Sequence, residues 1–201
     1  MSEQANPGSC TPGLKREQLM AISDSDISNA LAAYLECYPD DAAALAEPVR
    51  LLAQGTGFAS RRNFSMHVTV GALLVCGTQV LLVDHRAYGI PLQPGGHLEP
   101  TDQTLVGAAE RELVEETGID PSSLSLASQI PVYVEYGKVP ARPLKDEPEH
   151  HHLDFGYSFT TAKADVGRIQ ESEVRGAAWY PISAAEQLVG HRITRAIATP
   201  A

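Results

Sequence analysis

The chain has 201 residues, of which 43% are hydrophobic and 20% are charged, and its formal net charge is -10. These proportions are typical of a soluble globular protein with one main domain. A wide acidic surface repels nucleic-acid backbones and anionic membranes, so we expect no nucleic-acid duplex and no membrane as partner.

Targeting signals are not evident in the sequence. No stretch reaches the roughly 18 apolar residues of a membrane span, and the N-terminus lacks the basic start and apolar run of a signal peptide. The cysteines are odd in number and share no metal-like spacing, which indicates free thiols in a reducing compartment. They are Cys10, Cys37 and Cys76. We therefore expect a cytoplasmic protein.

The first 57 residues have a pattern of their own. Residues 1–20 are polar and contain prolines and glycines, which predicts a flexible tail. Apolar residues then recur at helical spacing from Ser23 to Tyr38, and a second helix is predicted after Asp40 and Asp41, which would cap it. Residues 21–57 are thus predicted to form an N-terminal helical hairpin, which is a packed extension, a homodimer surface or a lid.

From residue 58 onward the pattern changes from helix to strand. HVTVGALLVC (67–76) and QVLLVD (79–84) flank a short turn at Gly77 and Thr78, which predicts a β-hairpin. Both strands are almost entirely apolar. We therefore expect a sheet that is buried on both faces, between helices.

A helix is predicted from the turn at residues 100–102, which would cap it, to Gly118. Its apolar stripe recurs at intervals of three and four residues. The stripe consists of Val106, Ala109, Leu113 and Thr117. Glu112, Glu115 and Glu116 stand at i, i+3 and i+4, so they are predicted to share one face, away from the stripe.

Three acids on one face are locally unfavourable, because like charges at these spacings repel by roughly a few tenths of a kcal/mol per pair. A divalent cation would remove that penalty. Carboxylate oxygens suit Mg²⁺, Mn²⁺ or Ca²⁺, and Mg²⁺ leaves positions for water and substrate phosphates. The alternative is a solvated acidic helix face.

The segment RELVEETGI, from Arg111 to Ile119, reproduces the R-E-U-x-E-E-x-G-U half of the Nudix box, where U is aliphatic. The sequence resembles a Nudix hydrolase at this point. Gly96 matches the glycine that opens the box, and PLQPGG (91–96) resembles the family's usual entry to it. Small residues there let the backbone come close to metal and diphosphate.

The first half of the box departs from the family pattern. Asp102 or Gln103 stands where its first glutamate belongs, and this half is one residue longer than the pattern. In the family that glutamate mostly supports the box arginine. The partner of Arg111 is therefore open, with Glu99 and Asp102 both near enough in sequence.

The resemblance implies an α/β (α+β) fold in which a mixed sheet lies between helices, within a catalytic domain over residues 58–201. It implies hydrolysis of a small-molecule diphosphate, typically a nucleoside derivative, with Mg²⁺ or Mn²⁺ as cofactor. By the same resemblance Glu112, Glu115 and Glu116 are metal ligands and Gly96 offers its backbone to the metal. Glu112 is alternatively the group that orients the water, and Arg111 braces the loop.

Candidates outside the box come from two places. Arg86 follows the second strand, and its fork of donors suits a substrate phosphate.

A strand is predicted from Leu124 to Tyr136, followed by a loop over 137–148 that we expect to carry selectivity, and then by another strand through Phe159. A further strand is predicted over 177–180, ended by Pro181, with a final helix that Ser183 caps.

The start of the strand through Phe159 holds a His-x-His-x-Asp run that suits a transition metal. The resemblance favours another role, since Nudix enzymes commonly draw an additional ligand or a general base from this region. The candidates are Glu147, Glu149, His150, His152 and Asp154.

Two other functions compete with the hydrolase. A non-catalytic Nudix domain that senses a nucleotide usually has damaged glutamates in the second half of the box, and here that half is intact. An isomerase of prenyl diphosphates needs a cysteine-centred motif, whereas Cys76 lies in an ordinary apolar strand. The hydrolase is the interpretation that the sequence favours.

Overall fold

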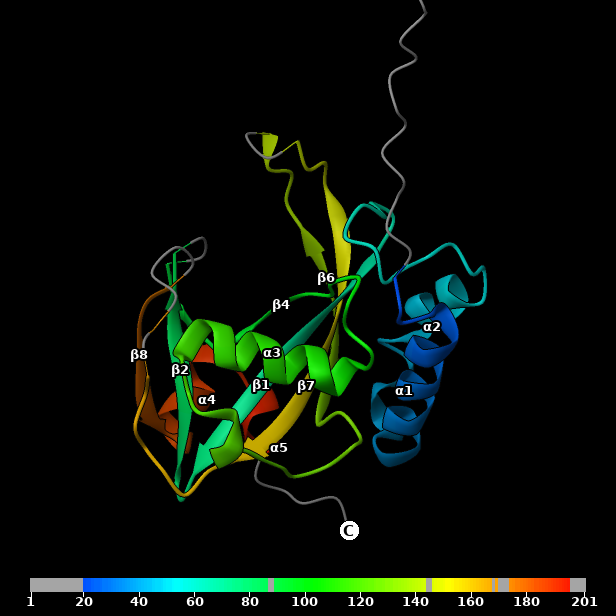
Figure 1. Ribbon diagram of the computed structural model, residues 1–201. Helices are drawn as coiled ribbons and strands as arrows, with labels where there is room; N and C mark the ends of the chain where they lie inside the picture. The colour runs from blue at the N-terminus through cyan, green and yellow to red at the C-terminus, as the bar shows by residue number, and fades with distance from the viewer. Residues whose placement is uncertain (1–19, 87–88, 144–145, 168, 170–173, 196–201) are drawn as a thin grey trace, which may run out of the picture.

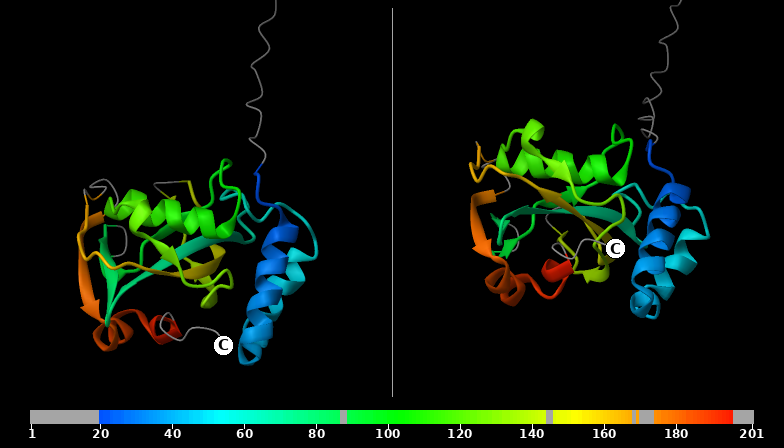
Figure 2. Two further views of the ribbon diagram at one scale, coloured as in Figure 1. Left: turned by 60° about the horizontal axis from the view of Figure 1, so that its bottom comes forward. Right: turned by 90° about the horizontal axis from the view of Figure 1, so that it is seen from below.

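The computed structural model describes residues 20–86, 89–143, 146–167, 169 and 174–195, so the predicted tail lies almost wholly outside the described residues. A sheet lies between helices (Figures 1 and 2). Helix α3 (Leu105–Thr117) covers one face, and α4 (Ile182–Val189) with α5 (Arg192–Arg195) lies against the other. The predicted α+β class, with a mixed sheet between helices, is confirmed. Within the described ranges, no helix has the length and apolar character needed to cross a membrane.

The sheet follows the order β3-β2-β1-β7-β5, and β4, β6 and β8 pair with β1, β7 and β2. Its strands are β1 (His67–Cys76), β2 (Gln79–His85), β3 (Pro91–Leu92), β4 (Gly95–His97), β5 (Ser125–Leu126), β6 (Tyr133–Val139), β7 (His150–Thr160) and β8 (Val174–Pro181). Strands β1 and β7 run parallel, and the other pairs of the sheet are antiparallel. The predicted hairpin of β1 and β2 is confirmed, with Gly77 at φ 58° in its turn.

Alternation along β1 and β7 divides the sheet into two faces. One face packs under α3 and contributes to the larger apolar cluster from β1 through Val68, Val70, Ala72 and Leu74, and from β7 through Leu153, Phe155, Tyr157 and Phe159. The opposite face carries the intervening residues, among them His67 and Thr69 of β1 and His152 and Asp154 of β7. In the parallel register, His67 lies opposite His152 and Thr69 lies opposite Asp154. Polar residues of two distant segments therefore meet on one face.

The prediction of one continuous strand from Leu124 to Tyr136 is wrong. This segment is divided into β5 and β6, and residues 127–132 are not strand. Pro131 lies in the gap, and a proline has no N–H to donate to a ladder. Strand β7 begins at His150, so the histidines and Asp154 do share a face, as an early start of the strand predicts.

Both N-terminal helices are present. Helix α1 (Asp24–Cys37) begins with a capping box between Ser23 and Asp26, and its buried face joins the cluster under α3. The predicted start of the second helix is wrong, because residues 39–42 form a 3₁₀ turn, η1 (Pro39–Ala42), and α2 (Ala46–Leu52) starts later. Asp41 does not cap a helix, since its carboxylate accepts hydrogen bonds from Tyr34 and Arg195. The hairpin thus shares the core of the domain.

Two predicted caps are also wrong. Helix α3 is capped by Thr104, whose Oγ1 accepts from the Gly107 N–H at 3.0 Å, rather than by the turn at residues 100–102. Helix α4 begins directly after Pro181, and Ser183 lies inside it. A short 3₁₀ turn, η2 (Pro121–Ser123), follows α3. The end of α3 is as predicted, with Gly118 in the left-handed conformation at φ 63°.

Candidate functional site

The three glutamates of α3 do not have equal surroundings. Glu112 and Glu116 are buried, at 7% and 0% exposure, whereas Glu115 is exposed. The predicted solvated acidic face, the alternative to a metal site, is therefore not what surrounds the buried pair, and Arg111 Nη1 contacts both Glu112 and Glu115. These two glutamates stand one helical turn apart and face β4, while Glu115 lies at the outer edge of the helix.

Strand β4 is what holds the buried pair. The N–H of Gly95 donates to Glu116 Oε2 at 3.1 Å. A Cβ added at Gly96 would lie 2.5 Å from Glu112 Oε1, so a side chain there would force the glutamate carboxylate to move. The close approach of the box glycines to the box helix thus depends on the absence of a side chain.

Arg111 connects the altered first half of the box to the helix. Its Nε and Nη2 donate to the two oxygens of Asp102, both at 3.0 Å, and Nη2 also donates to the His97 carbonyl. Its Nη1 donates to Glu112 and Glu115. Asp102, rather than Glu99, is thus the acid that supports the arginine. Burial alone would lower the pKa of Arg111, but Asp102 and Glu112 raise it above its ordinary value.

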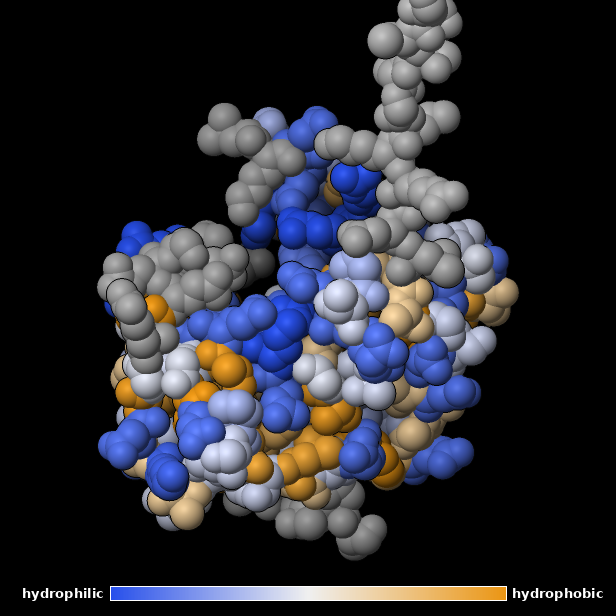
Figure 3. Space-filling model, in the orientation of Figure 1, coloured by the Kyte–Doolittle hydropathy of each residue, from blue (hydrophilic) through white to orange (hydrophobic). Residues whose placement is uncertain are grey.

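A cleft of about 830 Å³ opens beside β4 and is lined by both box glycines. Five cationic side chains contribute to its walls, against two acids, Glu135 and Asp154. The cations are Arg61, Arg86, Lys138, Arg142 and Arg192. Figure 3 shows hydrophilic side chains gathered on the face between α3 and the projecting β6–β7 hairpin. Three of the cations are in ion pairs, Arg61 with Glu147, Lys138 with Glu149 and Arg192 with Glu135. The cleft lining itself still has more basic than acidic side chains, which favours an anionic ligand.

Of these cations, only Arg86 was predicted from the sequence. Lys138 and Arg142 belong to the segment to which selectivity was assigned, and a count of its basic residues would have singled them out. Arg61 and Arg192 come from parts of the chain without a motif. Arg192 forms an ion pair with Glu135 and lies over the Tyr133 ring, with its guanidinium carbon 5.5 Å from the ring centroid, so two contacts hold it at the cleft.

The candidates after the box separate in space. Asp154 lines the cleft, and its carboxylate accepts from Thr69 Oγ1 at 2.8 Å and from the Tyr133 hydroxyl at 2.9 Å. Burial raises its pKa above the ordinary value. His152 also lines the cleft. Glu149, by contrast, is exposed and paired with Lys138 at 2.7 Å.

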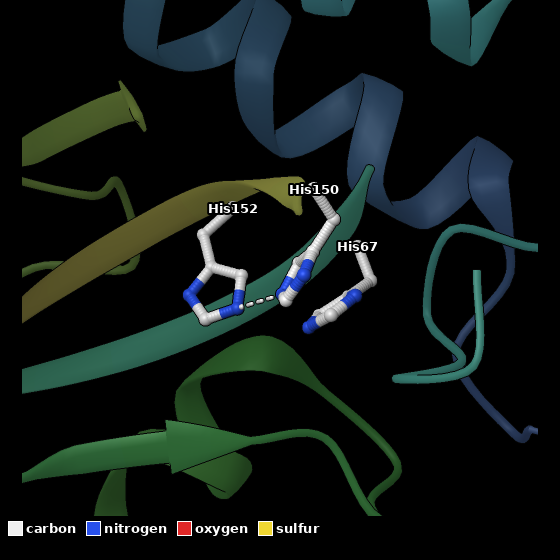
Figure 4. A group of neighbouring side chains, drawn as sticks. All are labelled: His67, His150 and His152. Atoms are coloured by element: carbon white, nitrogen blue, oxygen red, sulfur yellow. Dashed lines mark hydrogen bonds between the residues drawn. The ribbon is translucent and has the colours of Figure 1, made fainter. Parts of the chain in front are cut away.

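Histidines cluster at the edge of the cleft, where His152 and Asp154 are part of the lining, and Figure 4 shows three of them. His67, His150 and His152 bring their ligand nitrogens within 4.8 Å of one another, and the His97 ring lies 5.3 Å from that of His152. The group thus contains both histidines of the His-x-His-x-Asp run, together with His67 in place of Asp154. Burial lowers the pKa of His67 to about 4 and that of His152 to about 3.

Comparison with known proteins decides the family. The family model described as NUDIX domain matches residues 65–199, well over half of the chain. The chain belongs to the Nudix family. The matched range contains the sheet, the box helix α3 and the lining of the cleft except Arg61, whereas α1 and α2 precede it.

Among curated members of the Nudix family, phosphatase NudJ of Escherichia coli K12 is 50% identical over 58 residues, which are 28% of this chain and 37% of NudJ. The chain thus spans little more than a third of the length of such relatives. A NUDIX hydrolase structure from Clostridium perfringens matches with a TM-score of 0.51 at 23% identity, over 66% of this chain and 95% of that one. For the dihydroneopterin triphosphate pyrophosphohydrolase of E. coli the TM-score is 0.54 at 17% identity, over 64% and 92%. These likenesses show the Nudix fold.

The residues of this Nudix box fit a divalent cation. Of two buried carboxylates, Glu112 lies against Gly96, where a Cβ would collide with it, and Glu116 accepts from the Gly95 N–H. Buried carboxylates require a neighbouring positive charge, and hard oxygen donors suit Mg²⁺ or Mn²⁺. Glu115 stands at the exposed edge of the same helix, and Arg111 Nη1 donates to both Glu115 and Glu112.

Proposed function

We propose that this protein is a divalent-metal-dependent pyrophosphohydrolase that cleaves the diphosphate linkage of a small molecule, typically a nucleoside diphosphate derivative. The observation that carries the proposal is the position of the buried Glu112 and Glu116 behind Gly95 and Gly96, which form part of the wall of a cationic cleft. Acidic ligands for a cation and basic ligands for phosphates thus meet across one strand.

The roles of the side chains follow from their positions. Glu112, Glu115 and Glu116 would hold Mg²⁺ or Mn²⁺, with the backbone of Gly96 beside them. When bound, such an ion neutralises the diphosphate and lowers the pKa of a coordinated water. Arg111 positions the glutamates through the hydrogen bonds at Glu112 and Glu115.

The cleft residues bind and orient the substrate. Arg86, Lys138, Arg142 and Arg192 offer charge-assisted hydrogen bonds to phosphate oxygens, and fixing both ends of the linkage supplies the alignment that phosphoryl transfer needs. Selectivity for the attached group is assigned to the segment over 137–148, which contributes part of the cleft wall.

Asp154 is the best-placed general base. It lines the cleft, and Thr69 and Tyr133 hold its carboxylate in one orientation. A positioned base contributes about 10²- to 10⁴-fold to such reactions. His152 is the second candidate for this role, whereas Glu149 faces solvent in an ion pair with Lys138.

The test is a substrate panel with Mg²⁺ that contains ADP-ribose, NADH, diadenosine polyphosphates, nucleotide sugars and nucleoside triphosphates. Release of phosphate or of a monophosphate is measured, with and without chelator. Glu112→Gln and Glu116→Gln are expected to lower kcat/KM by about 100-fold or more, since outer-shell changes already cost 10- to 100-fold. Glu110→Gln, on the same helix, is the matched control and is expected to keep the parental activity.

Two results would overturn the proposal. One is turnover that persists in the glutamine variants or in excess chelator. The other is an absence of turnover with every compound while one of them still binds, which would favour the nucleotide-sensing alternative. The intact second half of the Nudix box supports the hydrolase over that alternative.

A further inference from the structure

Beyond the glutamates of the Nudix box, we propose that His67, His150 and His152 form a second metal site, which binds a first-row transition metal ion such as Zn²⁺. Imidazole nitrogens suit Zn²⁺, Cu²⁺, Ni²⁺ and Fe²⁺, whereas Mg²⁺ prefers oxygen. The two sites thus differ in ligand chemistry. The proposal does not depend on the reaction assigned to the cleft.

The distance between His150 and His152 is close to that of a tetrahedral centre, whereas separations of up to 4.8 Å within the group would have to shorten by about 1.4 Å on binding. The ligand atoms of the three side chains lie within 4.8 Å of one another, and His150 Nε2 lies 3.1 Å from His152 Nε2. Two nitrogens bound to one Zn²⁺ at about 2.0–2.1 Å in tetrahedral geometry stand about 3.3–3.4 Å apart. Binding therefore needs adjustments of a few tenths of an ångström between these two rings.

Backbone carbonyls fix the tautomer of two of the rings. His67 Nδ1 lies 3.1 Å from the Asn63 carbonyl, and His150 Nδ1 lies 2.7 Å from the Pro148 carbonyl. A carbonyl only accepts, so each Nδ1 carries the proton and each Nε2 presents a lone pair. Metal-binding histidines commonly have this outer contact, which also sets the orientation of the ring.

Without a metal ion, one ring nitrogen of the cluster has no hydrogen-bond partner among the described residues. The N–H of His152 can donate to His150 Nε2, which satisfies that pair. His67 is 2% exposed, and its Nε2 is buried without a hydrogen-bond partner among the described residues. Such an atom costs free energy unless something binds it. A metal ion at the centre of the cluster would engage all three rings.

The frame of the site is rigid. His67 opens β1 and pairs with His152 in the parallel ladder, and His150 stands two residues earlier on β7, where it pairs with β6, so the three side chains project from one face of the sheet (Figure 4). His152 also lines the cleft. Three histidine ligands leave a fourth position for water or for an anionic oxygen of a ligand in the cleft.

The experiment uses the full chain, purified without a histidine tag or a metal-affinity step, stripped by chelator and dialysed against Zn²⁺ or Co²⁺. Metal content is measured by mass spectrometry, and Co²⁺ coordination by visible absorption. We expect one tightly bound equivalent, with the intense d–d bands of a four- or five-coordinate Co²⁺ ion, and a rise in melting temperature on binding.

Variants separate this site from others. His67→Gln, His150→Gln and His152→Gln are each expected to weaken binding by about 100-fold or more. His151→Gln is the matched control, because His151 stacks on Tyr136, with the ring centroids 4.8 Å apart, and is expected to bind as the parent does. Circular dichroism checks that each variant is folded.

Measurements on the unmutated protein are sufficient to overturn the proposal. Substoichiometric metal after dialysis, or the weak spectrum of octahedral Co²⁺, would exclude a three-histidine site, whichever variants fold. Undiminished affinity in the folded glutamine variants would do the same. A Glu116→Gln variant that loses turnover with Mg²⁺ but keeps one Co²⁺ would show that the two sites are separate.

Discussion

Asp102→Ala tests how the chain compensates for its altered Nudix box. The carboxylate is 7% exposed and accepts three hydrogen bonds, two from Arg111 at 3.0 Å and one from the Glu99 N–H at 2.7 Å. Removing one partner of a buried ion pair costs about 3–5 kcal/mol. Arg111 keeps 19% side-chain exposure and contacts with His97 and two glutamates, so we take the lower end, about 3 kcal/mol.

For a protein of this size, each kcal/mol lowers the melting temperature by about 2–4 °C, which predicts a fall of about 6–12 °C for Asp102→Ala. Thermal and urea unfolding followed by circular dichroism measure the change. Gln103→Ala is the control, because Gln103 is exposed and bonds only locally, to the Thr101 carbonyl. Its effect is expected to stay within about 0.5 kcal/mol. A loss under about 1 kcal/mol in Asp102→Ala, or an equal loss in both variants, would refute the assignment of Asp102 as the arginine partner.

Other changes separate stability from activity. Gly96→Ala would force the Glu112 carboxylate away, which a flexible side chain permits, so we expect a folded protein whose kcat/KM falls by about 100-fold. Arg192→Ala removes a donor from the cleft and is expected to raise KM by about 10-fold or more, as steady-state kinetics would measure. Hydrogen bonds from Arg195 hold the pKa of Asp41 below its ordinary value of 3.8, so the pair stabilises the fold above that pH and is lost as the pH falls through the lowered pKa. Asp41→Asn is therefore expected to cost about 1 kcal/mol at pH 7, a difference that urea unfolding should find diminished near pH 3.

Local signals predicted the parts of the fold that depend on neighbours in sequence. The apolar strands around Gly77 gave the β1–β2 hairpin, and the spacing before Gly118 gave the end of α3. Caps were predicted less well, because Thr104 rather than the turn at residues 100–102 accepts from the Gly107 N–H, and the Asp41 carboxylate accepts from Tyr34 and Arg195 instead of capping a helix. Arg195, which donates to the Asp41 carboxylate, is 154 residues away along the chain.

Separation along the chain also explains which site residues were not predicted from the sequence. The pairing of β1 with β7 brings His67 to His152, 85 residues along the chain, and no periodicity in either strand encodes that pairing. Arg61 and Arg192 reach the cleft from opposite ends of the domain. The box helix could be predicted from the sequence because its glutamates and arginine lie within one stretch of chain. The cations that line the cleft come from separate segments.

The register of the β1–β7 ladder determines both which residues enter the core and which residues line the cleft. A slip of one residue in its register would turn His152 and Asp154 toward α3 and bring Leu153 and Phe155 into the cleft. Selection therefore cannot adjust the cleft by inserting residues within β7 without also inverting the core. The loop between β6 and β7 is outside this constraint, so its length and composition can diverge between relatives while the polar face of the ladder stays in place.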